Sequence, residues 1–180
     1  FVDRFYEFAR HITGYEEGDA DHLLDKLAWI IQRPFRRLPT GTIIYSHTRG
    51  SGKDVFMGLV REIIGPQYYM PITLQSIESP HIMLHDKLIC VASEVQLQTN
   101  ARGTIAAASF MGRLKDIITA KNVYVDQKFV QAYSAPIFTN FFLLSNFELS
   151  SILEPGDRRM DVFHAAEDKL DQDRFGALAD

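Results

Sequence analysis

The feature that most constrains the fold is a glycine-containing turn between an apolar run and an amphipathic segment. The run TIIYS at residues 42–46 is typical of a buried strand. The turn HTRGSGK follows at residues 47–53, and DVFMGLVREII then repeats apolar residues at helical spacing until Gly65-Pro66. This order of strand, glycine turn and helix is the setting in which a phosphate-binding loop works.

The turn departs from the phosphate-loop pattern G-x-x-x-x-G-K-[ST] at two positions. His47 stands at the first glycine, and Asp54 stands where the pattern has the hydroxyl that ligates Mg²⁺. The glycines, the lysine and the amides remain, so we expect ATP to be bound by Arg49, Gly50, Ser51, Gly52, Lys53 and Asp54. A turn of this composition without any phosphate-binding role is the alternative.

A second buried strand is predicted at residues 87–94, where KLICVASE ends in Ser93 and Glu94. In nucleotide hydrolases of this type an Asp followed by a Glu ends the strand beside the loop; the Asp supports Mg²⁺ and the Glu polarises the attacking water. We hypothesise that Asp54 and Ser93 have exchanged side-chain types, so that Mg²⁺ still receives one carboxylate and one hydroxyl, with Glu94 catalytic. A site that has lost its activity is the alternative interpretation of Ser93.

The remaining patterns predict helices at 2–12, 20–32 and 104–119, a hairpin arm at 122–129 and a strand at 137–146. Strands that alternate with helices predict an α/β P-loop NTPase core with a mostly parallel central sheet flanked by helices. We divide the chain into an N-terminal helical segment (1–38), the ATPase core (39–164) and a polar C-terminal tail (165–180).

Composition excludes a few classes of protein. The net charge of −4 argues against a surface that coats nucleic acid, although a local basic groove stays open. No apolar run approaches the roughly 20 residues of a membrane span, so no membrane partner is expected. The single cysteine, Cys90, fits a reducing compartment, and the six histidines show no metal-ligand spacing, so no zinc site is predicted. Because the chain begins at Phe1, we expect it to be a piece of a longer protein.

Several short motifs occur in a fixed order: W-x-x-Q-x-P, the glycine-rich loop, KLICVASE, LKDIITAKNVYVDQKF, FLLSN and GDRR. From about Asp25 to Phe163 this order resembles the superfamily 3 helicases of viruses and phages, especially the helicase portion of phage and plasmid primase–helicase proteins. The resemblance implies a modified AAA+ fold and an ATP- and Mg²⁺-dependent helicase for phage, plasmid or mobile-element DNA replication. Such proteins form rings, usually hexamers, with ATP at the subunit boundaries.

The resemblance also implies roles for particular residues. Ser145 and Asn146 match the polar sensor at a strand end, and Arg158 or Arg159 matches the arginine finger that reaches a neighbouring subunit. Lys128, with Lys121 and Phe129 nearby, would bind single-stranded DNA on a hairpin that projects into the ring. Without the resemblance, that hairpin could equally be an exposed edge whose lysine prevents aggregation.

The resemblance further implies a homo-oligomer, leaves room for a linked primase domain outside this stretch, and places the protein in the cytoplasm of a bacterial host or at an intracellular viral replication site. Two other functions stay open. A non-catalytic ring or scaffold would bind nucleotide to assemble and hydrolyse it poorly, as the altered Mg²⁺ positions indicate. A small-molecule P-loop kinase would need a phosphoacceptor pocket and a lid, for which the sequence gives no sign.

Overall fold

The centre of the structure, a computed structural model, is a five-stranded sheet with the strand order β2-β3-β6-β1-β7. The strands are β1 (Gly41–Tyr45), β2 (Tyr69–Pro71), β3 (Ile89–Ala92), β6 (Asn140–Ser145) and β7 (Met160–His164). All neighbouring strands run parallel, which confirms the predicted α/β core with a mostly parallel sheet. The structure describes residues 1–73, 76–77, 84, 86–93, 111–126, 131–146, 153, 156–171 and 175.

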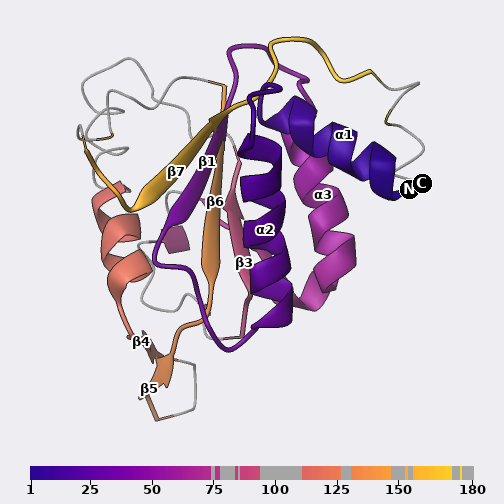
Figure 1. Cartoon of the computed structure of the whole chain (residues 1–180). Helices are drawn as coiled ribbons and strands as arrows, with labels where there is room; N and C mark the ends of the chain where they lie inside the picture. Colours follow the sequence, from indigo (N-terminus) through magenta and orange to yellow (C-terminus); the bar gives the residue numbers. More distant parts are fainter. Residues whose placement is uncertain are drawn as a thin grey trace.

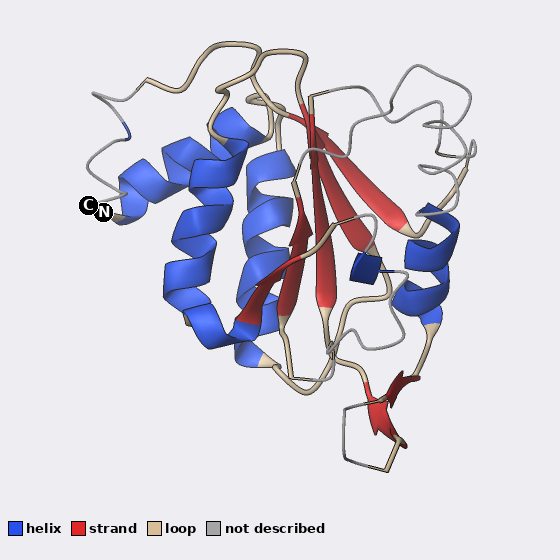
Figure 2. Cartoon of the chain, turned by 180° about the vertical axis from the view of Figure 1, so that it is seen from behind, coloured by secondary structure: helices blue, strands red, loops and turns tan. Residues whose placement is uncertain are grey.

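Helices cover both faces of this sheet. Helices α1 (Val2–Ile12), α2 (Asp19–Gln32) and α3 (Lys53–Ile64) lie on one face, and a helix over residues 111–119 lies on the other (Figures 1 and 2). A 3-10 turn, η1 (Pro66–Tyr68), leads from α3 into β2. None of the helices in the described ranges has the length and apolarity that a bilayer crossing requires.

The core has two layers because side chains alternate along each strand. Ile44 packs in the cluster under α1, α2 and α3, and its neighbour Ile43 packs in the cluster that contains the helix over 111–119. Every residue of β6 is buried, as expected for a central strand with helices on both faces. The long apolar run that predicted this strand is thus explained by two-sided burial.

A separate hairpin projects from the end of the sheet opposite the loop after β1 (Figure 1). It pairs β4 (Asn122–Val125) with β5 (Tyr133–Pro136) in antiparallel register, which confirms the predicted hairpin arm. The strand β5 leads into the amino end of β6, and the glycine turn follows the carboxyl end of β1. Because β6 and β1 are parallel, the hairpin and the turn lie at opposite ends of the strands. Residues 127–130, between β4 and β5 in the sequence, lie outside the described residues.

A buried ion pair joins α2 to the edge strand β7. Lys26 is 6% exposed, and its Nζ lies 2.5 Å from Asp161 Oδ2. The Thr40 hydroxyl donates to the same carboxylate oxygen at 3.0 Å. Burial alone raises the pKa of Asp161, but the hydrogen bond and positive charge of Lys26 hold the pKa of this carboxyl below its usual range. Lys26 therefore needs Asp161 as its counter-charge.

Replacing Asp161 with Asn should lower the free energy of unfolding at pH 7 by about 2 kcal/mol, because the Lys26 ammonium would stay buried without a charged partner. Lys26→Met should cost less, since the partly exposed carboxylate can be hydrated. The depressed pKa also sets the pH dependence: the contribution is present above the unfolded pKa of about 4 and is lost as the pH falls through the lower folded value. Urea titrations at pH 7 and pH 3 measure both effects, and an equal pH response in wild type and Asp161→Asn would contradict the assignment.

Candidate functional site

The loop between β1 and α3, named the phosphate loop after its predicted role, contains two glycines with positive φ angles. Gly50 and Gly52 have φ angles of +82° and +90°, a region that other residues rarely adopt, and α3 begins directly afterwards at Lys53. A Cβ atom on Gly52 would lie 2.9 Å from the end of the Leu170 side chain, so a larger residue would have to displace Leu170 as well as adopt a strained backbone conformation. The amides in the first turn of α3 have no acceptor within the helix. They lie directly after the loop, and together with the helix dipole they favour an anion there.

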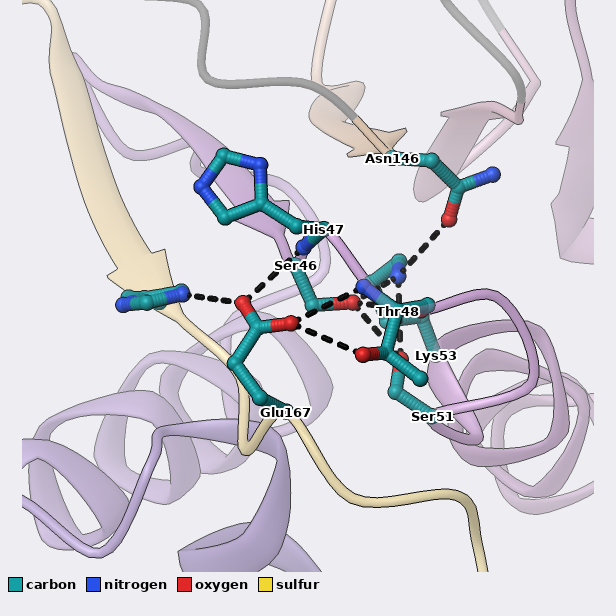
Figure 3. A network of polar contacts seen from close by, with 8 residues as sticks. Ser46, His47, Thr48, Ser51, Lys53, Asn146 and Glu167 are labelled. Carbon is teal, nitrogen blue, oxygen red and sulfur yellow. Dashed lines mark hydrogen bonds and ion pairs between the residues drawn. The ribbon is translucent and has the colours of Figure 1, made fainter.

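The Lys53 ammonium is buried at the centre of this loop (Figure 3). It donates three hydrogen bonds, to Ser46 Oγ at 2.6 Å, Ser51 Oγ at 2.9 Å and Asn146 Oδ1 at 3.2 Å. Burial lowers the pKa of Lys53, as expected for a cation removed from water. Among the described residues all three acceptors are neutral and no carboxylate forms an ion pair with Lys53, although the charges of Asp54 and Glu167 act on it from further away. The ammonium is therefore placed to attract an additional anion.

A cavity of about 610 Å³ opens beside this lysine. It is lined by residues 49–55 of the loop and α3, by residues 144–146 at the end of β6, and by Lys169 and Leu170. The predicted nucleotide-binding residues 49–54 are therefore all brought to one cavity, whose volume lies in the range usual for small-molecule sites. Lys169 and Leu170 have no counterpart in the sequence prediction.

Asp54 and Ser93 meet at the mouth of the site. Ser93, which follows β3, donates its hydroxyl to Asp54 Oδ1 at 2.8 Å, and both residues are exposed. Strand β6 lies between β3, which Ser93 follows, and β1, which leads into the loop. The carboxylate and hydroxyl are nevertheless neighbours, and together they make an oxygen pair of the kind that Mg²⁺ prefers.

Asn146 follows β6, the strand between β1 and β3, and this position explains its contact with Lys53. The structure therefore brings the predicted sensor residue to the phosphate loop. The predicted catalytic Glu94 and the predicted DNA-binding residues Lys128 and Phe129 lie outside the described residues. Lys121 is exposed and directly precedes β4, at the base of the hairpin.

The two candidate finger residues differ in their surroundings. Arg159 donates from Nε to Asp157 Oδ1 at 3.1 Å, and the other oxygen of this carboxylate lies 2.6 Å from Lys115 Nζ. The Asp157 side chain is only 3% exposed, and the hydrogen bond from Lys115, together with those from Arg159, strongly lowers its pKa. Arg158 is exposed, with no ion pair among the described residues. Both arginines lie just before β7, at one edge of the sheet.

The C-terminal segment, expected to be only a polar tail, forms part of the site. Glu167 accepts hydrogen bonds from the amides of His47 and Thr48 and from the Thr48 hydroxyl, each at 2.9 Å (Figure 3). Leu170 donates its amide to the Gly50 carbonyl at 2.8 Å. The hydrogen bond from the His47 amide, followed by that from His164, lowers the pKa of Glu167 to about 2. No local sequence pattern connects Glu167 with a loop 120 residues away, so sequence analysis had no signal for it.

Helix α1 supports the loop from its other side. His11 is buried, and its Nε2 lies 3.0 Å from the Ser51 carbonyl oxygen, to which it must donate because a carbonyl can only accept. The His11 carbonyl in turn accepts the Ala166 amide at 2.9 Å. The N-terminal helical segment and the C-terminal segment thus meet beneath the phosphate loop and hold it from two directions.

Replacing Glu167 with Ala should accelerate amide exchange of residues 47–50 about tenfold, because three hydrogen bonds that hold the first half of the loop are lost. Hydrogen–deuterium exchange of the protein without nucleotide measures this directly. Asp168→Ala is the matched control, since it removes an exposed carboxylate one residue away. Equal exchange in the two variants would show that the loop is fixed without Glu167.

Comparison with solved structures shows the same fold. The apo structure of the NrS-1 C terminal region (305-718) superposes with a TM-score of 0.80 and 20% identity, over 98% of this chain and 42% of that chain. The X-ray structure of JCV Helicase gives a TM-score of 0.54 and 11% identity, over 91% of this chain and 45% of that chain. The chain therefore spans less than half the length of these structures. At such identities the likeness concerns the fold alone.

No curated protein sequence matches the chain. A family match does exist, to the family described as "Family of unknown function (DUF5906)", and it covers residues 44–159. The matched range contains the phosphate loop, Ser93, Asn146 and the arginine pair, and it is more than half of the 180 residues. The protein therefore belongs to the DUF5906 family.

Proposed function

We propose that this chain is the ATP-hydrolysing, DNA-translocating core of a superfamily 3 type helicase that acts in phage, plasmid or mobile-element replication. The observation that carries the proposal is the buried Lys53 ammonium, whose hydrogen bonds among the described residues go to the neutral groups of Ser46, Ser51 and Asn146 and to no carboxylate. A nucleotide triphosphate would supply negative charge beside it, and the adjoining cavity of about 610 Å³ offers room for the nucleotide. Fold likeness to a helicase structure supports the same class of activity.

The Asp54–Ser93 pair is the proposed position for Mg²⁺. Their side-chain oxygens already lie 2.8 Å apart at the exposed mouth of the site, so the pair fits a cation that prefers oxygen ligands and keeps several waters. The ion would neutralise phosphate charge during phosphoryl transfer. Because Asp54 is the second residue of α3, its carboxylate is positioned by the helix that also presents the phosphate-binding amides.

Hydrolysis would require groups from two subunits. In the proposed site Glu94, directly after Ser93, polarises the attacking water, and Asn146 contacts the γ-phosphate. Arg158 is the better candidate for the finger from the next subunit, because Arg159 is already bound to Asp157 in its own chain. A ring, proposed as a hexamer, would complete each site, so an isolated subunit would hydrolyse ATP slowly.

The hairpin is the proposed contact for single-stranded DNA. It projects from the end of the sheet opposite the loop after β1 (Figure 1). Lys121, which directly precedes β4, is exposed. Tyr124 on β4 is 67% exposed, so the hairpin presents an aromatic ring as well as a cation. Lys128 and Phe129, which lie between β4 and β5 in the sequence, would add the same two chemistries, which suit binding that is independent of base sequence.

A nucleotide-binding ring or scaffold with little hydrolysis is the second candidate. It is favoured by one observation, the replacement of the usual Mg²⁺-binding hydroxyl by Asp54, whose carboxylate is hydrogen-bonded to Ser93. Such a protein would bind Mg²⁺-ATP with similar affinity but would show no turnover that depends on DNA.

Calorimetry and ATPase assays with and without single-stranded DNA test the proposal. Wild type should bind Mg²⁺-ATP and show DNA-stimulated hydrolysis. Lys53→Ala should weaken ATP binding about tenfold to hundredfold, because a charged hydrogen-bond donor at the phosphates is lost. Lys128→Ala should retain ATP binding and lose the stimulation by DNA. Binding without turnover in wild type would favour the scaffold, and no heat from ATP or GTP with Mg²⁺ would remove both candidates.

The paired substitution of Asp54 and Ser93 tests the proposed metal position. Ser93→Asp should weaken Mg²⁺-ATP binding about tenfold, because two carboxylates then face each other beside the triphosphate. Asp54→Ser combined with Ser93→Asp should restore binding, since one acid and one alcohol are present again. Titrations with Mg²⁺ held in excess measure the affinities. A double variant that binds no better than the weaker single variant would disprove the exchange.

A further inference from the structure

Three metal-ligating side chains gather beside the phosphate loop, outside the cavity proposed for nucleotide. They are His47 at the start of the loop, His164 at the end of β7, and Glu167 three residues later. One potential ligand atom from each lies within 4.8 Å of the others, and all three residues are exposed. They come from segments more than 100 residues apart, so only the fold brings them together.

Hydrogen bonds and ring stacking hold these three side chains close to one another, so only small movements are needed to bind an ion. The Glu167 carboxylate is oriented by the His47 amide and by the Thr48 amide and hydroxyl. The His164 ring stacks on Tyr45 with centroids 4.6 Å apart and planes 5° apart. The His47 ring stands nearly perpendicular to the His164 ring, with centroids 5.9 Å apart. Outer contacts of this kind orient the ligands in protein metal sites.

The ligand types select the class of metal. Two imidazoles and one carboxylate suit Zn²⁺ and the neighbouring transition metals, whereas Mg²⁺ prefers oxygen ligands alone. Zinc ligands at about 2.0–2.2 Å in tetrahedral geometry lie about 3.3 Å from one another. His164 Nε2 and Glu167 Oε1 are now 2.6 Å apart in a hydrogen bond, so a small side-chain rotation would open this distance to the required value.

We propose that His47, His164 and Glu167 form a binding site for a divalent transition metal of the zinc class. The ion takes the place of the hydrogen between His164 Nε2 and Glu167 Oε1. In neutral His164 that proton moves to Nδ1 and leaves Nε2 free to coordinate, and in the imidazolium one proton passes to solvent. Water fills the remaining coordination positions, because the three side chains are exposed. The ion joins the C-terminal segment to the first residue of the phosphate loop and thereby stiffens the loop.

This site does not depend on the proposed ATPase function, and its test uses no nucleotide. Protein treated with a chelator and dialysed is titrated with ZnCl₂ by calorimetry and with CoCl₂ by visible absorption, in excess MgCl₂. We expect one ion per chain. His47→Ala and His164→Ala should each weaken binding at least about tenfold, because a direct ligand is lost. His22→Ala is the control, since this exposed histidine lies near Asp161 and outside the cluster.

Amide exchange of residues 47–50 distinguishes an ion site from a hydrogen-bonded brace. Zn²⁺ should slow exchange in wild type and should not slow it in Glu167→Gln, which retains an acceptor but lacks the charged ligand. Circular dichroism establishes that each variant is folded. Absence of zinc binding would overturn the proposal. Equal zinc affinity in His47→Ala, His164→Ala and the His22→Ala control would also overturn it. The latter result would place the ion on other side chains, such as His81 and His85, which lie outside the described residues.

Discussion

The structure depends most on one buried cation that is held by neutral oxygen atoms. The three partners of Lys53 come from the end of β1, the end of the loop and the end of β6, so one ammonium group fixes three segments relative to one another. A buried charge is tolerated only where every donor finds an acceptor, and this one uses all three. The loop is then supported from outside by His11 on α1 and by Glu167 and Leu170 near the C-terminus.

The sequence predicted the parts of the fold that arise from local patterns. The strand, glycine turn and helix over residues 42–64 could be recognised because the spacing of apolar residues and the glycines of a turn are visible within a short stretch of sequence. The same holds for the hairpin arm and for the fully apolar strand β6. The strands β2 and β7 were not predicted, and both lie at the edges of the sheet. Edge strands are buried less completely, and β2 has three residues and ends at Pro71, so neither leaves a long apolar run.

The candidate site was predicted only where its residues lie in the motifs. The amides of residues 47 and 48 are held by a glutamate from an unremarkable polar segment, and nothing in its neighbours marks that role. Likewise, the sequence did not separate Arg158 from Arg159, because the difference comes from the buried Asp157–Lys115 pair. The contact between Ser93 and Asp54 was hypothesised from their chemistry. The sequence did not show that β6 lies between β3, which precedes Ser93, and β1, which precedes the loop and α3. Long-range contacts of this kind depend on strand order, which single-residue patterns do not encode.

The position of the hairpin gives β6 a mechanical role in the proposed motor. Asn146 follows the carboxyl end of this strand, and β5 joins its amino end through residues 137–139. A six-residue strand spans about 20 Å, and this one is buried along its whole length between helices and neighbouring strands. Both edges of the strand are paired, with β1 on one side and β3 on the other, so β6 cannot slide without breaking these ladders. In the proposed motor, a displacement at Asn146 would therefore reach the hairpin only if the central strands moved together.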